Sequence, residues 1–341
     1  MKAILAGQKR EPDVVSTVLR AVRPTSAIFY DNGAHAPWVS ETPATALIAR
    51  FIFPEAERII PFHVITVGSC WAEFHDDSVA PVRLGEGDIL LVPGGQRHVL
   101  GSSPGLREEP NLGEYERSLD GWLPLAFVIN KANGPESCHF VCGFIGCDAG
   151  PFNPLLDALP RMVVARTSAA DREWLTELVH TAVSETEDRG VGAETVLASL
   201  AEIMFVEVMR QHLAGLPEDA RGWFSGLKDR RVGAALRLIH TRPAAPWTVA
   251  RLAREVGMSR SGFAQRFGEY VGMSPIHYLG RWRMQLAVRT LARQGASVAQ
   301  AAAEVGYESE AAFRRAFRKF ARALPAAWRR RDGAGGGLSA G

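Results

Sequence analysis

The sequence predicts an α+β protein of two domains: an N-terminal β-barrel followed by helices, and a C-terminal all-α domain of two helix-turn-helix units. Three observations lead to this prediction. Short β-rich runs separated by turns occupy residues 27–100, a spacing typical of a sandwich or barrel. One helical pattern occurs twice between Thr248 and Pro325. The charge is also divided unequally, because residues 225–331 hold 21 Lys and Arg against 6 Asp and Glu, a formal +15 in a chain of net charge +2.

The N-terminal domain is expected over residues 1–216. It begins with an amphipathic helix over Asp13–Arg20, where apolar residues recur at helical spacing. Apolar and β-branched residues then predict strands at 46–53, 62–67, 70–74 and 89–92. Two amphipathic helices follow, over 169–186 and 192–213. The second is apolar around much of its circumference, so we expect it to be buried in its own domain or against a second subunit.

Residues 217–226 are expected to form a linker, residues 227–331 the all-α domain, and the glycine-rich residues 332–341 a disordered tail. No apolar run reaches the roughly 18 residues that span a bilayer, and the N-terminus lacks the apolar core of a signal peptide. We therefore expect a cytoplasmic protein that makes no membrane contact.

Each copy of the C-terminal repeat is predicted to form a helix, a tight turn and a second helix. In the first copy, a short apolar helical face ends at Gly257 and Ser259 suits the N-cap of the next helix. Phe263 and Phe267 then form an i, i+4 apolar pair on that helix. The second copy has the same residue types 49 or 50 positions later, at Gly306, Ser309, Phe313 and Phe317.

Paired helix-turn-helix units with a strong positive charge are typical of a DNA-binding domain. The region resembles the DNA-binding domain of the AraC family of transcription regulators. In the first unit the resemblance rests on Trp247–Val249, Leu252–Ala253, Gly257–Arg260, Phe263, Arg266–Phe267, Gly272–Pro275 and Trp282–Met284. In the second unit it rests on Val305–Tyr307, Ser309, Phe313, Ala316–Phe317 and Pro325, with one departure at Arg322, where the first unit has Gly272. The resemblance implies double-stranded promoter DNA as a partner, with RNA polymerase as a further one.

The residues opposite the phenylalanine pairs are the candidates for contact with DNA. In the first unit they are Ser261, Ala264, Gln265 and Gly268, which also match family positions that approach bases, and Arg260 is a further candidate. In the second unit they are Glu310, Ala311, Arg314, Arg315 and Arg318. Arginine can bond two acceptors of guanine, so Arg314 or Arg315 is expected to discriminate one base pair; contact with phosphates alone is the alternative.

Residues 87–98 resemble the second conserved motif of cupin barrels, with Gly87, Pro93, Gly95 and His98 in place. The resemblance implies the cupin-type sensor half of an AraC-family regulator. Metal-binding cupins take further ligands from an earlier motif, and the corresponding positions here are Pro54, Ala56 and Pro61. None of these side chains can coordinate a metal, so we expect no metal and no other cofactor.

The barrel is expected to bind a small organic effector in a pocket bordered by His63, Trp71 and His98. An indole offers apolar area with one donor, and a neutral imidazole offers one donor and one acceptor. The alternative is that all three side chains are core residues. The helices after the barrel are expected to pair two subunits into a homodimer.

Three of the four cysteines fall close together with a histidine, at Cys138, His139, Cys142 and Cys147. They could be buried and inert, form a thiol redox sensor, or bind zinc, although the usual Cys-x2-Cys knuckle is missing. An alternating strand would send Cys138 and Cys142 to one face and Cys147 to the other.

The sequence therefore predicts a sequence-specific transcription regulator that responds to a small-molecule effector. One alternative is a regulator that responds to redox state or zinc through its cysteines, and another is a metal-dependent cupin enzyme. The missing metal ligands weigh against the enzyme, and neither a phosphate-binding glycine loop nor a Gly-x-Ser-x-Gly elbow occurs. We expect no enzymatic activity and assign no catalytic residue.

Overall fold

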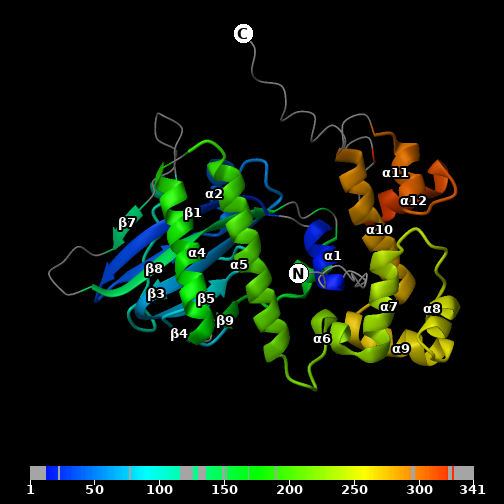
Figure 1. Ribbon diagram of the computed structural model, residues 1–341, viewed down its shortest axis with the longest axis horizontal. Coiled ribbons are helices and arrows are strands. Elements are labelled where there is room, and N and C mark those ends of the chain that lie inside the picture. The colour runs from blue at the N-terminus through cyan, green and yellow to red at the C-terminus, as the bar shows by residue number, and fades with distance from the viewer. Residues whose placement is uncertain are drawn as a thin grey trace, which may run out of the picture. The chain divides into compact units, whose positions relative to one another are not determined.

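The structure is a computed structural model that describes residues 13–21, 24–76, 78–115, 126–129, 136–147, 150, 152–167, 169–188, 190–292, 296–321 and 325. The chain divides into two compact units (Figure 1). The barrel unit contains residues 23–148 and 159–215, and the helical unit contains residues 1–22, 149–158 and 216–341.

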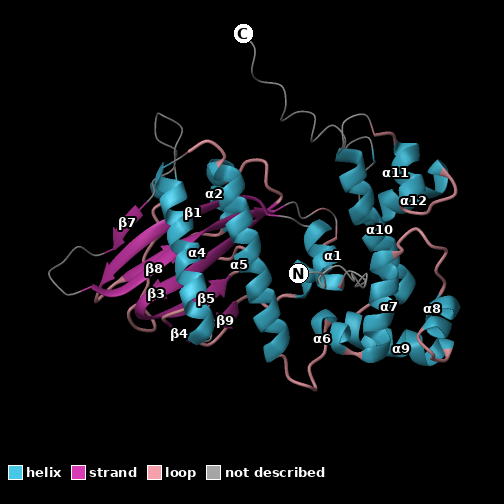
Figure 2. Ribbon diagram, in the orientation of Figure 1, coloured by secondary structure: helices cyan, strands magenta, loops and turns pink. Residues whose placement is uncertain are grey.

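The barrel unit is built on one sheet, in which nine strands are described (Figure 2). They are β1 (Pro24–His35), β2 (Val39–Thr42), β3 (Arg58–Phe74), β4 (Val82–Gly85), β5 (Asp88–Leu91), β6 (His98–Gly101), β7 (Ala126–Ile129), β8 (Glu136–Cys147) and β9 (Val163–Arg166). The main path runs β2-β6-β3-β8-β1-β7, while β4 pairs with β3, and β5 pairs with both β3 and β9. The predicted β-rich fold of this half is confirmed.

The long strand β3 links the two parts of the barrel sheet. Its first part pairs with β5 and β8, and its last residues pair with β4 and β6. The register shifts between Ile65 and Val67, and Gly68 follows with a φ of 75°. The predicted strands at 62–67 and 70–74 are therefore two stretches of one irregular strand.

The strand predicted at 46–53 is wrong, because these residues form helix α2 (Thr45–Ile52). Ile48 and Ile52 lie one turn apart and are both fully buried, whereas Leu47 is 57% exposed. This is the burial of an amphipathic helix, and the alanine, leucine and arginine in the run favour it. A short apolar run can fit either state, and here the helical period decides.

Helices α4 (Ala169–Asp188) and α5 (Ala193–Gly215) lie where the sequence predicts two amphipathic helices. They pack on each other and on β1, and α5 also contacts β9. The inner face of α5 buries Leu197, Ala201, Met204 and Val208. A short 3-10 helix, η1 (Leu112–Tyr115), contacts α2.

The helical unit takes its helices from three stretches of the chain. They are α1 (Val14–Ala21), α3 (Pro154–Ala158), α6 (Trp223–Lys228), α7 (Arg230–Thr241), α8 (Val249–Glu255), α9 (Arg260–Val271), α10 (Pro275–Ala292), α11 (Val298–Glu304) and α12 (Glu310–Ala321). Helix α1 packs on α3, α7 and α10, and α3 packs on α6. The expected N-terminal domain over 1–216 therefore differs from the compact units, since two of its segments pack with the C-terminal helices.

The linker expected at 217–226 is also shorter than predicted. Trp223 and Phe224 begin α6 and are buried at 5% and 3% exposure, because their aromatic rings gain more from burial than from solvent. The tail at 332–341 and the departing turn at Arg322 lie outside the described residues. No helix in the described part of the chain is both long enough and apolar enough to cross a membrane.

Residues 152–158 are fastened to α10 by one hydrogen bond and two ring contacts. The backbone N–H of Phe152 donates to Gln285 Oε1 at 3.0 Å. The Phe152 ring meets the Tyr278 ring edge-on at 5.4 Å between centroids, and the Arg281 guanidinium lies 4.1 Å from its centre. Phe152 and Gln285 are both buried, so the barrel is followed by a segment that belongs to the core of the helical unit.

Candidate functional site

The first helix-turn-helix unit consists of α8 and α9, as the sequence predicts. Thr248 caps α8 by accepting from the N–H of Arg251, and Ser259 caps α9 by accepting from the N–H of Gly262. Gly257 makes the turn between them with a φ of 65°, a conformation that favours glycine. The Phe263 and Phe267 rings are fully buried 5.7 Å apart, which fixes the opposite side of α9 toward solvent.

The second unit, α11 and α12, repeats this construction. Ser297 caps α11, and the Ser309 hydroxyl accepts from the N–H of Ala312 at the start of α12. Gly306 turns the chain with a φ of 81°. Phe313 and Phe317 are fully buried against α10 and α11. The predicted repeat of capped helix, glycine turn and phenylalanine pair is confirmed in both units.

The candidate residues on the exposed side of α9 include one charged side chain, Arg260. Arg260, Ser261 and Gln265 are exposed, and Ala264 and Gly268 are half-buried, so all five candidates lie away from the core. Gln265 Nε2 donates to Glu269 Oε1 at 3.0 Å, one turn further along the helix. Small side chains dominate this face, so it can approach another surface closely.

The positive charge of Arg266 on α9 is used within the helical unit. Arg266 donates to the Asp229 carboxylate through Nε at 3.2 Å and through Nη2 at 2.5 Å. Asp229 is the N-cap of α7 and also accepts from the N–H groups of Arg231 and Val232. Burial opposes its ionisation, but these hydrogen bonds hold the Asp229 pKa below its usual value. The ion pair fixes α9 to the start of α7.

The exposed side of α12 is strongly basic. Ala311, Arg314, Arg315 and Arg318 are exposed and Glu310 is half-buried. Arg314 donates to Glu310 Oε1 through Nε at 2.7 Å and again through Nη2. Neither Arg315 nor Arg318 has an ion pair or hydrogen bond to another side chain in the described part of the chain. The second unit thus presents two guanidinium groups whose donors are free for another molecule.

Arg283 on α10 holds the loop before the first unit through two hydrogen bonds to its backbone. Arg283 Nε donates to the carbonyl of Pro243 at 2.8 Å, and its Nη2 donates to the carbonyl of Ala245 at 2.9 Å. The same guanidinium lies 5.5 Å from the centre of the Tyr307 ring, in the turn of the second unit. One side chain therefore contacts elements of both helix-turn-helix units.

In the barrel unit, two of the three expected effector residues lie together. His63 on β3 and His98 on β6 are buried, and their Nε2 atoms are 2.7 Å apart. Burial and the neighbouring His98 lower the pKa of His63, and burial lowers the pKa of His98 to about 4. Both imidazoles are neutral at pH 7 as a result.

Trp71, the third expected effector residue, does not lie with the histidines. The register pairs Phe74 with His98, and Ala72 with Leu100, so these four side chains share the inner face. Trp71 alternates with Ala72 and lies on the other face with Glu73. Its grouping with His98 is therefore wrong. No group of three or more His, Cys, Asp or Glu side chains within the described ranges could hold a metal ion.

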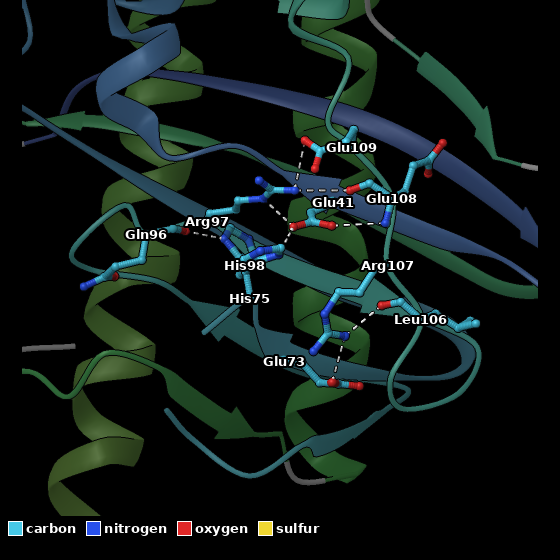
Figure 3. Close-up of polar contacts among 10 residues, drawn as sticks. All are labelled: Glu41, Glu73, His75, Gln96, Arg97, His98, Leu106, Arg107, Glu108 and Glu109. Carbon is cyan, nitrogen blue, oxygen red and sulfur yellow. Dashed lines mark hydrogen bonds and ion pairs between the residues drawn. The ribbon is translucent and has the colours of Figure 1, made fainter. Parts of the chain in front are cut away.

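The face that Trp71 shares carries a polar network that the sequence analysis missed (Figure 3). The Glu41 carboxylate is fully buried and accepts from Arg97 Nε at 2.5 Å, His75 Nδ1 at 2.9 Å and the N–H of Glu108 at 3.1 Å. Glu73 accepts from the N–H of Gly105 at 2.8 Å and from Arg107 at 3.0 Å. Two buried carboxylates thus hold the loop after β6 against the outer face of the sheet.

The cysteines do not form a zinc site. Cys138, Cys142 and Cys147 lie along the single strand β8, where four residues span roughly 13 Å. Thiolates that share a zinc ion must each lie about 2.3 Å from it. His139 lies on the opposite face from Cys138, where its Nε2 contacts Asp31 Oδ1 at 2.7 Å. The zinc alternative is therefore wrong.

Burial also opposes a role in redox sensing. Cys70, Cys138 and Cys147 are buried and Cys142 is partly buried. Burial raises the pKa of Cys142 to about 12, although Asn32 Nδ2 donates to its sulfur at 3.1 Å. A hydrogen bond with Cys138 and burial both raise the Cys70 pKa. The thiolate is the reactive form, so this environment favours inert packing.

Comparison with known proteins agrees with this architecture. The family model described as Cupin matches residues 13–214, and the Helix-turn-helix domain model matches residues 252–331. The chain is 33% identical over 265 residues to an AraC-like transcription regulator of Streptomyces lividans, covering 78% of this chain and 84% of that protein. It is 32% identical over 267 residues to the HTH-type transcriptional regulator AlkR of Acinetobacter baylyi, covering 77% and 85%. Among solved structures, the DNA-binding domain of AdpA in complex with a target DNA is 28% identical with a TM-score of 0.30, covering 33% of this chain and 99% of that one.

Proposed function

Because the chain belongs to the AraC-like family of DNA-binding transcription regulators with an N-terminal cupin domain, we propose that it reads promoter DNA sequence-specifically and responds to a small molecule in its barrel. The observation that carries the proposal is the exposed face of α12, with the unpaired Arg315 and Arg318. Free guanidinium groups on a recognition helix can form bidentate hydrogen bonds with guanine. The proposal puts the protein in the cytoplasm with its DNA.

The two recognition helices, α9 and α12, offer different side chains to DNA. Helix α9 offers mostly small, neutral side chains, which suit close approach and apolar contact with base edges. Helix α12 offers the arginines that can select guanine. For both to enter one face of B-DNA, their major-groove sites must lie about one turn, or roughly 34 Å, apart. A footprint should therefore cover two successive grooves per subunit.

Base reading is tested by selecting binding sites for the full chain and for Arg315→Ala. Loss of a bidentate contact should remove roughly 1–3 kcal/mol of discrimination at one base pair and leave preferences elsewhere intact. Arg237→Ala is the matched control, because Arg237 is exposed on α7 and the change removes the same charge. A uniform loss of affinity with a shallower salt dependence would instead assign Arg315 to phosphate contact.

The effector response is tested by a thermal-shift screen followed by DNA-binding assays with each stabilising compound. A true effector must bind the DNA-competent and DNA-incompetent states with different affinity, so it must change the DNA dissociation constant. Elemental analysis should find no stoichiometric metal. Metal-dependent turnover of a substrate would support the enzyme alternative.

A homodimer is supported by the outer face of α5. Val196 is 38% exposed and Ile203 is 48% exposed, and they lie two turns apart on one side of the helix. Ile203→Asp should shift the mass measured by light scattering to that of a monomer. Val67→Asp is the control, because Val67 is 57% exposed on β3 and its change should leave the mass unaltered. Equal masses for all three proteins would contradict this interface.

A further inference from the structure

The donor and acceptor roles in the buried pair of His63 and His98 can be assigned, starting from a backbone carbonyl that contacts His98. His98 Nδ1 lies 2.8 Å from the carbonyl oxygen of Gln96, a contact drawn in Figure 3. A carbonyl oxygen only accepts, so Nδ1 carries the hydrogen. Burial lowers the His98 pKa to about 4, so the ring is neutral and its Nε2 holds a lone pair.

The direction continues through His63. The two Nε2 atoms are 2.7 Å apart, and one must donate to the other. Since His98 Nε2 is the acceptor, His63 Nε2 carries the hydrogen. His63 is also neutral, because burial and His98 lower its pKa. Its remaining nitrogen, Nδ1, is therefore an acceptor, and it is buried with no hydrogen-bond partner from the described residues.

A second unsatisfied group lies in the same interior. The indole N–H of Trp38 is buried and finds no acceptor in the described part of the chain. The Trp38 ring stacks on Phe140 with centroids 5.4 Å apart, and the His63 ring lies 6.5 Å from the same phenylalanine. Apolar side chains surround them, namely Ile65, Phe74, Leu90, Val92 and Leu100. An apolar, aromatic interior thus contains one buried acceptor and one buried donor, and buried polar groups in proteins are usually paired.

We propose that the barrel interior binds an uncharged ligand with a planar apolar body and a hydroxyl or N–H group that donates to His63 Nδ1. The proposal rests on the proposed function of the barrel as effector domain. An ionised carboxylate on the ligand could only accept, so it could not form a hydrogen bond with His63 Nδ1, which is also an acceptor. An ammonium ligand would lack a counter-charge, because Glu41 and Glu73 are on the other face of the sheet and are already paired. Neutral phenol-like compounds have the required chemistry.

The direction of the pair can be measured without knowing the ligand. In the full chain with 15N-labelled histidines, NMR should find His63 protonated at Nε2 and His98 protonated at Nδ1. The opposite tautomer for His63 would overturn the proposal, because its Nδ1 would then be a donor.

Ligand chemistry is tested with phenol and anisole, which have similar shape and differ in the O–H donor. Phenol should bind at least tenfold more tightly, and saturation should shift the His63 Nδ1 resonance. His63→Phe should equalise the two affinities, whereas Trp71→Phe, on the other face of β3, should preserve their ratio. Equal affinities for the original chain would overturn the proposal. So would failure of both probes to bind, which would leave a buried water as the partner of His63.

The outcomes also separate this inference from the effector function. If another compound alters DNA binding without moving the His63 resonance, the effector function holds and the proposed ligand chemistry fails. If phenol binds as expected but no barrel ligand alters DNA binding, the site holds and the effector function fails.

Discussion

The turn glycines of the helical unit allow a sharp test of its packing. Gly306 and Gly272 have similar backbone conformations, with φ of 81° and 72°. A methyl group added at Gly272 would meet nothing within 4 Å. At Gly306 it would lie 2.6 Å from Cα of Ala244 and closer still to the Ala244 carbonyl oxygen. Gly272→Ala therefore measures the conformational cost alone, and Gly306→Ala adds a backbone collision.

The expected magnitudes follow from these two terms. A left-handed conformation costs a non-glycine residue about 1–2 kcal/mol. Overpacking adds about 1–3 kcal/mol when neighbours must move, and Ala244 cannot move freely because Arg283 holds the carbonyls on both sides of it. We expect Gly272→Ala to destabilise its surroundings by about 1 kcal/mol and Gly306→Ala by about 3 kcal/mol.

Hydrogen exchange measured by mass spectrometry on the full chain gives the local free energy of opening for each helix. Peptides from α11 and α12 should lose protection in Gly306→Ala, and DNA affinity should fall with them. Peptides from the barrel serve as an internal control. Equal losses for Gly306→Ala and Gly272→Ala would refute the argument that the Ala244 loop is fixed.

Three other predictions concern ion pairs, protonation and the segment after the barrel. Asp229→Ala should lose both the Arg266 ion pair and the α7 cap, lowering the local opening free energy of α7 and α9 measured by hydrogen exchange by about 1–2 kcal/mol. In the original chain the ion-pair part of this stability should be lost as pH falls through the depressed Asp229 pKa. The His98 pKa is about 4, against an ordinary value of 6.5, because burial favours the neutral ring. The free energy of unfolding should therefore be highest above pH 6.5 and fall by up to about 3 kcal/mol as the pH drops to 4. Urea unfolding of the barrel at a series of pH values should detect this loss. Gln285→Leu removes the acceptor of the Phe152 N–H, so limited proteolysis should cut residues 152–158 faster than in the original chain. Gln300→Leu is the control, because Gln300 is exposed on α11 and its replacement should leave the cleavage rate unchanged.

The helix-turn-helix units could be predicted nearly residue by residue because their signals are local. Serine caps, turn glycines and phenylalanine pairs at i, i+4 lie within a few positions of each other. Because the same pattern occurs twice, each copy supports the assignment of the other. The strand prediction for residues 46–53 was wrong because an apolar run of eight residues fits either a strand or a helix. Only the one-turn spacing of Ile48 and Ile52 indicates the helix.

The barrel site could be predicted only in part because its contacts join distant residues. His98 could be predicted from the cupin-like motif and His63 from its residue type, but the face that Trp71 occupies depends on the register with β6. Glu41 meets the N–H of Glu108 across 67 positions, and Phe152 meets Gln285 across 133. No local pattern carries such pairings, so the buried carboxylates and the fastened segment had no signal in the sequence.

The route of the chain limits which parts of it can be excised as an independent domain. The backbone passes between them four times, after residues 22, 148, 158 and 215. Two pieces, α1 and residues 152–158, pack within the helical unit, although the barrel residues 24–76 and 159–167 follow them in sequence. Excision of the helical unit at residue 216 would therefore expose the apolar surfaces on α7 and α10 that these pieces cover, and the isolated fragment would be a different object from the unit in the intact chain.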